Sequence, residues 1–334
     1  MLPTKMKAVR QNAPGAPLDV CELPVPLPQK GEVLVKMAYA PFNPSDISAL
    51  RGLYVDQKQY PFTPGIEGSG IVVGAGNGLL PKLRMGKRVC CSSGNSGGTW
   101  AEYMCTPATR VIPLKPGIGL EQGAMLIVNP MTALAFMEMA RKGKHKAIVN
   151  SAAASVLGQM LIKLCKQYQL PLINIVRRSE QVSSLKNQGA EHVLNMSEEG
   201  FPEALASLSH QLGATLLFDA VGGELTAVLV DAAPVGSTIV IYSNMSDQPF
   251  SINARSLIQK DKSISNFYLG TWTSKQNILK TLKAAKNVQK LVADELQSKV
   301  RMRYPLDQVN EALNDYQNQM TGGKILLQMN SDLF

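Results

Sequence analysis

Short runs of alternating apolar and polar residues, interrupted by glycine and proline, make up the first 118 residues of the chain. Lys5–Gln11 and Glu32–Ala38 show the two-residue period of strands with one buried face. Glycines crowd residues 65–78 around a further strand-like run, Gly70–Val73. The pattern predicts a mostly antiparallel, turn-rich β domain.

From Leu120 the hydrophobic period changes, and apolar strand-like runs alternate with helix-like segments. The expected strands are Lys146–Asn150, Leu172–Val176, Glu191–Leu194, Thr215–Asp219, Ser237–Ile241 and Ile264–Leu269. The expected helices between them are Val156–Gln169, Glu180–Asn187, Pro202–Gln211 and Glu224–Ala232. Six strands with intervening helices predict an α/β domain with a doubly wound parallel sheet.

The last part of the chain carries an amphipathic helix after Lys275 and then two strand-like runs, Val300–Tyr304 and Lys324–Gln328, around a helix. These strands and this helix resemble the elements of the first domain, so we expect the chain to return to it. The expected boundaries are 1–122 for the first part of the β domain, 123–269 for the α/β domain and 270–334 for the returning segment.

The order strand, small-residue turn, helix, strand in residues 147–178 is that of the phosphate-binding half of a dinucleotide fold. Small side chains let a pyrophosphate approach the backbone, and the following helix offers N–H groups and the positive end of its dipole. The residues expected to hold the pyrophosphate are Ser151, Ala152, Ala153, Ala154, Ser155, Val156, Leu157 and Gly158. Gly158 alone fills a glycine position of the G-x-G-x-x-G pattern, so a strand–helix–strand unit without a cofactor is the alternative interpretation.

Two arginines, Arg177 and Arg178, follow the second strand of this unit, where such folds bind the adenosine ribose. An acidic residue there would accept a hydrogen bond from the 2′-hydroxyl of NAD, whereas arginine pairs with a 2′-phosphate. The pair therefore predicts NADPH as the cofactor, with a solvated strand end as the alternative.

The composition of this chain of 334 residues argues against a membrane protein, a metal site and a need for nucleic acid. No apolar run reaches the length of about 18 residues that a membrane span needs, and no apolar signal or arginine-rich leader is visible, so we expect a cytoplasmic protein that does not bind membranes. The five cysteines are scattered, and none of the three histidines is near one in sequence, so no metal site is expected. The net charge of +9 is spread along the chain and requires no nucleic-acid partner.

Several short stretches carry a family resemblance through their order and spacing. They are Phe42–Ile47, Arg51–Tyr54, Pro64–Gly70, Gly98–Trp100, Val128–Ala133, Gly189–Val193, Ala220–Gly223, Phe267–Trp272 and Gly322–Leu326. With them, nearly the whole chain resembles the medium-chain dehydrogenase/reductase family, and it looks most similar to the zinc-free branch of enoyl-thioester reductases and quinone oxidoreductases. The resemblance implies a Rossmann cofactor domain inserted in a GroES-like β domain.

The same resemblance argues against zinc. Zinc-dependent members place a cysteine near Asn43–Ser45 and a histidine before Glu67; here Ile66 takes the place of the histidine, and Glu67 is expected to be structural. Without a Lewis acid, alcohol oxidation loses its usual means of stabilising an alkoxide. Reduction of an activated C=C bond needs none, because hydride adds to the β-carbon and negative charge collects on a carbonyl oxygen that hydrogen bonds can stabilise.

The resemblance also implies catalytic residues. Tyr54 follows a glycine as in the enoyl-thioester reductases, and its phenol is protonated at neutral pH, so it can protonate or stabilise an enolate. Ring packing, or replacement by the nearby Tyr60, are the alternatives. Asn43 would face the nicotinamide and the substrate, or cap the helix that Pro44 begins, or do both.

Further site residues rest on the resemblance. Asn129 and Thr132 would lie against the nicotinamide, and Gly222 and Gly223 would form a loop under the cofactor. The remaining implied contacts are Phe267, Leu269 and Lys324 for the cofactor, and Trp100 and Trp272 for the wall of the substrate pocket. Helix capping, ordinary turns and core packing are the alternatives for these residues.

Together these expectations describe a metal-free, NADPH-dependent reductase of α,β-unsaturated carbonyl compounds. Its small-molecule substrate would be an enoyl thioester, an enone or a quinone. Quinone reduction needs a proton donor less strictly, because the reduced ring takes protons from water. A non-catalytic NADPH-binding protein, structural or RNA-binding, is the alternative of another class. We expect a homodimer through the apolar edge strand Ile264–Leu269, which would otherwise stay exposed.

Overall fold

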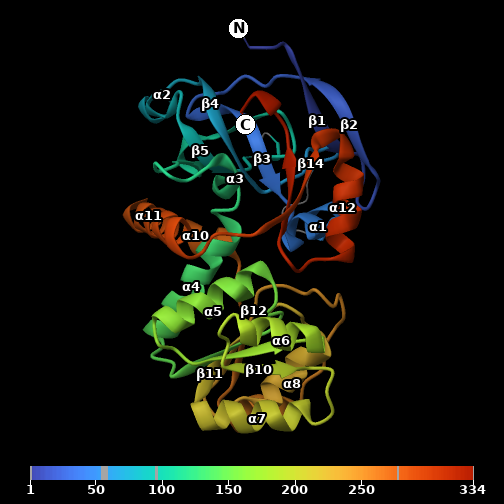
Figure 1. The fold of residues 1–334 in the computed structure, drawn as a ribbon, viewed down its shortest axis with the longest axis vertical. Helices are drawn as coiled ribbons and strands as arrows, with labels where there is room; N and C mark the ends of the chain where they lie inside the picture. The colour runs from blue at the N-terminus through green and yellow to red at the C-terminus, as the bar shows by residue number, and fades with distance from the viewer. Residues whose placement is uncertain (1, 54–58, 95–96, 277, 334) are drawn as a thin grey trace. The chain divides into compact units, whose positions relative to one another are not determined.

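The computed structural model describes residues 2–53, 59–94, 97–276 and 278–333 (Figure 1). The chain forms two compact units, one made of Met1–Pro130 with Ala285–Phe334 and the other of Met131–Ala284. Each unit is built around a sheet of its own. Within the described ranges, no helix combines the length and the apolar character needed to cross a bilayer.

The strands of the first unit are β1 (Lys5–Gln11), β2 (Leu18–Pro24), β3 (Glu32–Pro41), β4 (Glu67–Ala75), β5 (Arg88–Ser92), β6 (Tyr103–Pro107), β7 (Val111–Pro113), β14 (Val300–Pro305) and β15 (Lys324–Gln328). β1 and β2 form a hairpin, and the others form a seven-stranded sheet in the order β14-β15-β3-β4-β5-β7, with β6 also paired to β3. The pairs are antiparallel except for β14 with β15. Because β15 pairs with β3, the end of the chain completes the sheet that its beginning starts.

The helices of this unit are α1 (Pro44–Leu50), α2 (Leu79–Arg84), α3 (Leu120–Gly123) and α12 (Val309–Asn318), with 3-10 turns η1 (Ala108–Arg110), η2 (Leu306–Gln308) and η3 (Ser331–Leu333). Helices α1 and α12 lie side by side in Figure 1 because Ile47 and Leu50 share one core with Val309 and Tyr316. Burial of these apolar side chains from both ends of the chain therefore joins the two segments of the unit.

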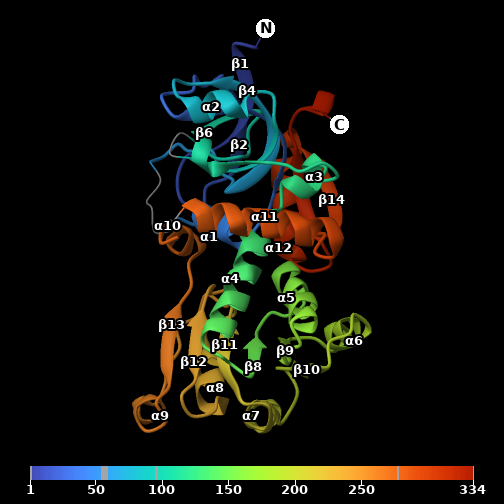
Figure 2. The same ribbon diagram turned by 90° about the vertical axis from the view of Figure 1, so that its left-hand side faces the viewer.

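The strands of the second unit are β8 (Ala147–Asn150), β9 (Leu172–Val176), β10 (His192–Asn195), β11 (Ala214–Asp219), β12 (Thr238–Ile241) and β13 (Ser263–Asn266). Its helices are α5 (Val156–Gln167), α6 (Ser179–Asn187), α7 (Phe201–Leu212), α8 (Glu224–Ala232), α9 (Ala254–Ile258) and α10 (Leu269–Ser274), and α4 (Val128–Lys142) and α11 (Ile278–Asp294) cross the boundaries between the units. All pairs are parallel in the order β10-β9-β8-β11-β12-β13 (Figure 2). The predicted doubly wound α/β fold is confirmed.

Helices cover both faces of this parallel sheet, which explains why its central strands are nearly continuous apolar runs. On one face, Val149 and Leu217 pack in a core with Leu205 of α7 and Leu229 of α8. On the other face, Phe218 of β11 stacks on Phe136 of α4 with ring centroids 3.9 Å apart. Adjacent residues of one strand thus pack into opposite layers.

The edge strand differs from the expectation. The sequence predicts Ile264–Leu269, whereas β13 ends at Asn266 and Leu269 begins helix α10. Pairing stops at Asn266 because its partner is Ile241, the last residue of β12. Only Ile264 of this strand is half-buried and its other residues are exposed, so the expected apolar edge is not present in β13.

Helix α1 begins with a buried capping arrangement. Asn43 is its N-cap and Pro44 its first residue, so the capping interpretation of Asn43 is confirmed. Asp46 Oδ2 accepts a hydrogen bond from the backbone N–H of Asn43 at 2.8 Å. Burial raises the pKa of the Asp46 carboxyl to about 7; the charge of Glu67 adds to this, while the Asn43 N–H and the Lys324 ammonium oppose it.

Asp46→Asn should remove a pH-dependent loss of stability. Asp46 ionises near its ordinary value of 3.8 in the unfolded chain and at about 7 in the folded one. Between these values only the unfolded state has lost the proton, so the free energy of unfolding falls as pH rises, by about 1.4 kcal/mol per pH unit. Asparagine keeps an acceptor for the Asn43 N–H but does not titrate.

We expect the wild type to lose roughly 2 kcal/mol relative to Asp46→Asn between about pH 5 and about pH 7, measured by urea unfolding. Asp19→Asn, at an exposed position, is the control and should follow the wild type. Parallel pH profiles for the wild type and Asp46→Asn would contradict the expectation.

Candidate functional site

The carboxyl ends of β8 and β11 meet where the strand order of the second unit reverses. From β8 the chain proceeds outward through β9 and β10, and β11 then lies on the other side of β8 (Figure 2). In open α/β sheets such a switch point forms a crevice in which ligands bind. The turns that follow β8 and β11 are therefore the candidate cofactor site.

The β8–α5 turn, Ser151–Ser155, approaches its helix closely. Ala152 adopts a φ of 50°, in the left-handed region, which bends the chain sharply after the strand. Ser155 caps α5, since its Oγ accepts a hydrogen bond from the Gly158 N–H at 3.1 Å. A Cβ at Gly158 would collide with the carbonyl oxygen of Ala153. The single glycine of the motif is thus placed where helix and turn need the closest approach.

Asp219, the last residue of β11, is fully buried and joins the turns on the two sides of the switch point. Its Oδ1 accepts hydrogen bonds from Ser151 Oγ at 2.8 Å and from the Val221 N–H at 2.9 Å, and its Oδ2 accepts one from Thr226 Oγ1 at 2.7 Å. Ser151 Oγ accepts in turn from the Ala220 N–H at 2.8 Å. The sequence analysis did not single out Asp219; the available signal was an acidic residue ending a buried parallel strand just before two glycines.

Those glycines, Gly222 and Gly223, form the tight turn between β11 and α8. Their φ angles of 74° and 58° lie in the left-handed region, and a Cβ at Gly222 would collide with Oδ1 of Asn244. Both positions therefore require glycine. The turn exists as expected, and its contact with a cofactor stays a prediction.

Arg177 and Arg178 are exposed at the end of β9, and their surroundings differ. Both backbone N–H groups donate to Gln181 Oε1 at 3.2 Å. The Arg178 guanidinium also pairs with Glu180 at 2.7 Å. A phosphate that used Arg178 would have to share it with a carboxylate, so Arg177 is the better placed of the two.

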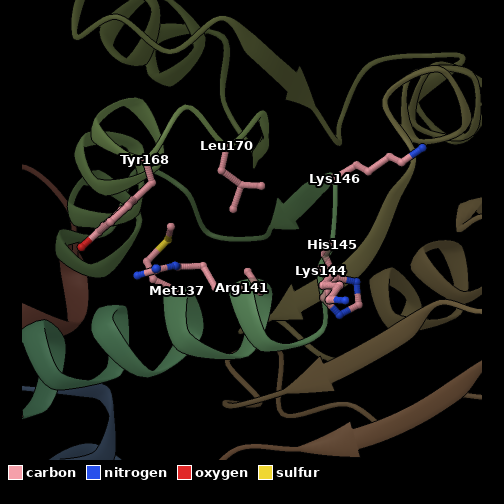
Figure 3. A pocket seen from close by; sticks show the side chains of 8 residues that line it. Met137, Arg141, Lys144, His145, Lys146, Tyr168 and Leu170 are labelled. Atoms are coloured by element: carbon pink, nitrogen blue, oxygen red, sulfur yellow. The ribbon is translucent and has the colours of Figure 1, made fainter.

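A hollow of about 260 Å³ lies at the opposite end of β8, away from the switch point. Its lining residues are Met137, Ala140, Arg141, Lys144, His145, Lys146, Tyr168 and Leu170. Figure 3 shows Lys146 pointing away from the other side chains, and the Arg141 guanidinium lies 5.4 Å from the centre of the Tyr168 ring. Because the cationic groups do not converge, this hollow does not compete with the switch point as a phosphate site.

The first unit contains a buried polar cluster of Asn43, Glu67 and Lys324. Lys324 Nζ donates to Asn43 Oδ1, and Asn43 Nδ2 donates to Glu67 Oε1 at 3.1 Å. Glu67 Oε2 accepts from the backbone N–H groups of Ile127 and Val128 at 3.0 and 2.9 Å. Burial raises the pKa of Glu67 and lowers that of Lys324, and in each case the charge of the other residue opposes the shift.

The structure places Lys324 in this cluster, and its expected contact with the cofactor stays a prediction. Its side chain is buried, and Nζ also donates to the Phe42 carbonyl at 3.1 Å, because a buried Glu67 carboxylate needs a compensating cation nearby. The Asn43 amide is likewise occupied on both sides by Lys324 and Glu67. A contact between Asn43 and a substrate stays a prediction.

The two tryptophans differ. Trp100 is fully buried, and its ring centroid lies 4.5 Å from that of Phe42, so it belongs to the core of the first unit, and its expected place in the substrate pocket stays a prediction. Its size explains its position in the core, since it fills the centre of a core shared by both segments of the chain. Trp272 is half-buried in α10 and keeps its predicted role as a proposal.

The other residues expected near the cofactor lie at the start of α4 and after β13. Asn129 is the second residue of α4, so the interpretation of Asn129 as a helix cap is wrong, and Thr132 is buried one turn later. Phe267 packs edge-on against Phe136 with centroids 5.0 Å apart, and Leu269 is half-buried. Their cofactor contacts stay predictions.

The candidate proton donor, Tyr54, lies outside the described residues. The alternative donor, Tyr60, is half-buried, and its ring packs edge-on against Phe62 with centroids 5.2 Å apart. In the described part of the chain, no group of three or more histidine, cysteine, aspartate or glutamate side chains is arranged to hold a metal ion.

Two family models match the chain, one in each unit. The model described as "Alcohol dehydrogenase GroES-like domain" matches residues 29–116, and that described as "Zinc-binding dehydrogenase" matches residues 156–284. The first covers Asn43 and Glu67 of the buried polar cluster, and the second begins with α5 and covers the Gly222–Gly223 turn before α8.

Relatives in sequence and structure span most of the chain. The mitochondrial enoyl-[acyl-carrier-protein] reductase of Arabidopsis thaliana is 31% identical over 280 residues, which is 80% of this chain and 73% of the relative. The Homo sapiens enzyme of the same name is 30% identical, with 81% and 74% covered. A Mesorhizobium loti structure assigned as an NADPH:quinone reductase has a TM-score of 0.91 and 30% identity, with 98% and 99% covered.

A mycobacterial structure complexed with NADPH has a TM-score of 0.84 at 22% identity and covers 97% of this chain and 99% of its own, which shows a shared fold. Three findings point to the same family. They are the two matched domain models, the enoyl reductase that is 31% identical over 80% of this chain, and the strand order with its switch point. The chain belongs to the medium-chain dehydrogenase/reductase family.

Proposed function

We propose that this protein is a metal-free, NADPH-dependent reductase of activated C=C bonds that acts on 2-enoyl thioesters or enones. The observation that carries the proposal is the dinucleotide turn at the switch point, with Gly158 against Ala153 and two arginines at the end of β9. Relatives named as enoyl reductases support this substrate class. They also weigh against a non-catalytic or RNA-binding role.

The residues of the second unit suit a dinucleotide. The β8–α5 turn carries no side chain larger than serine, and α5 begins there with backbone N–H groups that can donate to a pyrophosphate. Arg177 and Arg178 can pair with a 2′-phosphate, and Asn129 and Thr132 would contact the nicotinamide. NADPH, when bound, supplies the hydride that adds to the β-carbon of the substrate.

The chain's own residues would handle the proton. Tyr54 is the proposed donor to the enolate oxygen or α-carbon, because a neutral phenol can give up a proton to a developing negative charge. The metal-free character is supported by Ile66, which stands where zinc-dependent members have a histidine. Turnover that survives a chelator, in protein free of stoichiometric zinc by elemental analysis, is the result we expect.

Quinone reduction is the second candidate function, because the Mesorhizobium loti structure assigned as an NADPH:quinone reductase covers nearly the whole chain at 30% identity. The absorbance of NADPH, followed with crotonyl-CoA, an enone and 1,4-benzoquinone, separates the two. Faster turnover of crotonyl-CoA would support the enoyl proposal. Turnover of benzoquinone alone would favour the quinone alternative.

Arg177→Ala should weaken NADPH binding more than Arg178→Ala. Arg178 is held by Glu180, whereas the loss of Arg177 removes the better placed partner of the 2′-phosphate. Losing one charge-assisted pair should raise the dissociation constant for NADPH by roughly 10–100-fold and leave that for NADH nearly unchanged. Both constants can be measured by fluorescence titration.

Arg255→Ala, in the exposed helix α9 of the same unit, is the matched control and should bind NADPH as the wild type does. If the wild type binds NADH and NADPH equally well, the preference for NADPH is wrong.

Tyr54→Phe should lower the turnover of an enoyl-CoA by roughly 10²–10³-fold, the range for loss of one general acid or transition-state donor. NADPH affinity and thermal stability should stay the same, because only a hydroxyl is removed. Benzoquinone reduction should fall less, since water can protonate that product.

Tyr60→Phe tests the alternative donor, and Tyr168→Phe, at the exposed residue that follows α5 in the second unit, is the neutral control. Near wild-type turnover by Tyr54→Phe on every substrate would show that its hydroxyl is not the acid.

A homodimer remains a proposal. The apolar edge strand that the sequence predicts does not occur in β13, so it gives the dimer no support. The support that is left is the family and the position of β13 at the edge of the sheet. Light scattering at micromolar concentration should give twice the mass of 36.1 kDa. A monomer mass would exclude the dimer.

A further inference from the structure

We propose that Glu67 is a positioning residue: its buried carboxylate fixes the first turn of α4 and thereby the orientation of Asn129, and Asn43 and Lys324 hold that carboxylate in place. This inference rests on the proposed function only in that Asn129 is taken to contact the nicotinamide. It assigns a role to Glu67 that needs no zinc, which fits a chain with Ile66 where zinc-dependent members have a histidine.

Glu67 takes the place of a missing local cap on α4. The helix begins at Val128, and the residue before it, Ile127, has no side chain that could accept a hydrogen bond. The first N–H groups of a helix have no partner within the helix. Glu67 Oε2 accepts from the N–H groups of both Ile127 and Val128 at 3.0 and 2.9 Å. A carboxylate at this end of a helix also interacts favourably with the helix dipole.

The direction of the hydrogen bonds in the buried polar cluster is fixed. Lys324 has only donors and the Glu67 carboxylate only acceptors, so the Asn43 amide between them has one workable orientation, with Oδ1 toward Lys324 and Nδ2 toward Glu67. All three side chains are buried. A small movement of the carboxylate would leave a buried donor unpaired, so the cluster resists displacement.

The consequence lies one residue further along the chain. Asn129 follows directly on Val128, so the two N–H groups that Glu67 holds belong to the two residues that immediately precede Asn129. A group that orients a nicotinamide must be held to within a fraction of an ångström, because small misplacements reduce rates strongly. Glu67 therefore acts through Asn129, without contact to the reacting atoms.

Glu67→Gln is the first test. Glutamine keeps the size but has one acceptor oxygen and adds donors that face Asn43 Nδ2. We expect kcat to fall roughly 10–100-fold, with the KM for the enoyl substrate within about threefold of the wild-type value. Amide hydrogen exchange should quicken in residues 125–133 and stay unchanged in the sheet of the second unit. The exchange readout does not depend on activity, so it separates this inference from a failure of the proposed function.

Two ligands give a second readout. NADPH contains the nicotinamide and adenosine 2′,5′-bisphosphate does not. Glu67→Gln should weaken the binding of NADPH several-fold and leave the binding of adenosine 2′,5′-bisphosphate unchanged. Asn129→Ala should have the same pattern, and adding Glu67→Gln to Asn129→Ala should cost little more, because both act on one contact.

Lys324→Met tests the counter-charge. Alone it leaves the Glu67 charge buried without its cation, whereas the double variant Glu67→Gln/Lys324→Met removes both charges and should melt at a higher temperature than Lys324→Met. Glu121→Gln is the matched control, since Glu121 pairs with Arg303 at the surface of the same unit, and it should change neither kcat nor exchange in residues 125–133.

If Glu67→Gln does not fold, Glu67→Asp, which keeps the charge and shortens the side chain, is measured in the same way. Wild-type kcat with wild-type exchange in either folded variant overturns the proposal. If neither variant folds, Glu67 is only structural and the proposal is also overturned.

Discussion

A carboxylate removed from water must be surrounded by hydrogen-bond donors, and two such carboxylates organise the functional parts of this molecule. Glu67 in the first unit gathers Asn43 and two N–H groups at the start of α4. Asp219 in the second unit gathers Ser151, Thr226 and the backbone after β11. In both units a buried negative charge at one end of a strand fixes a segment that is distant in sequence. Each carboxylate therefore adds a constraint, within its own unit, to the one that glycines and tight turns already set.

The glycine pattern shows what a nucleotide motif requires of a chain. The sharp bend after β8 is made by Ala152 in the left-handed region, a conformation that costs alanine about 1 kcal/mol, and glycine is kept at Gly158, where a side chain cannot fit. Packing of β8 and α5 compensates for the bend, but no rearrangement of side chains could make room at Gly158. The G-x-G-x-x-G motif reflects the backbone bend and the close approach of helix and turn that a nucleotide site needs. This chain satisfies both with one of the three glycines, Gly158.

Sequence reasoning succeeded where a local pattern decides the structure. The bounds of β9 and α8 agree with the expectation because a strand buried on both faces is a nearly continuous apolar run, interrupted here by Asn174, and because Gly223 precedes the helix directly. It failed where partners are distant in the chain. Lys324 reads as a charged residue after two glycines, and nothing near it reveals that Asn43 lies against its ammonium. Trp100 lies in a core that both ends of the chain build, and the end of β13 is set by the length of its neighbour β12.

Because the first unit is made of two segments from the two ends of the chain, it can finish folding only after the whole chain has been synthesised. The second unit is one continuous stretch, so its parallel sheet can close while the ribosome still holds the C-terminus. The Tyr39–Pro41 end of strand β3 must wait for β15, which emerges last; until then the edge of β3 that β6 pairs over Glu32–Lys36 has no partner at this end. An open edge in a nascent chain is a template for pairing with other chains. Stalled translation or C-terminal truncation should therefore cause aggregation through the first unit, while the second unit can still fold as a fragment.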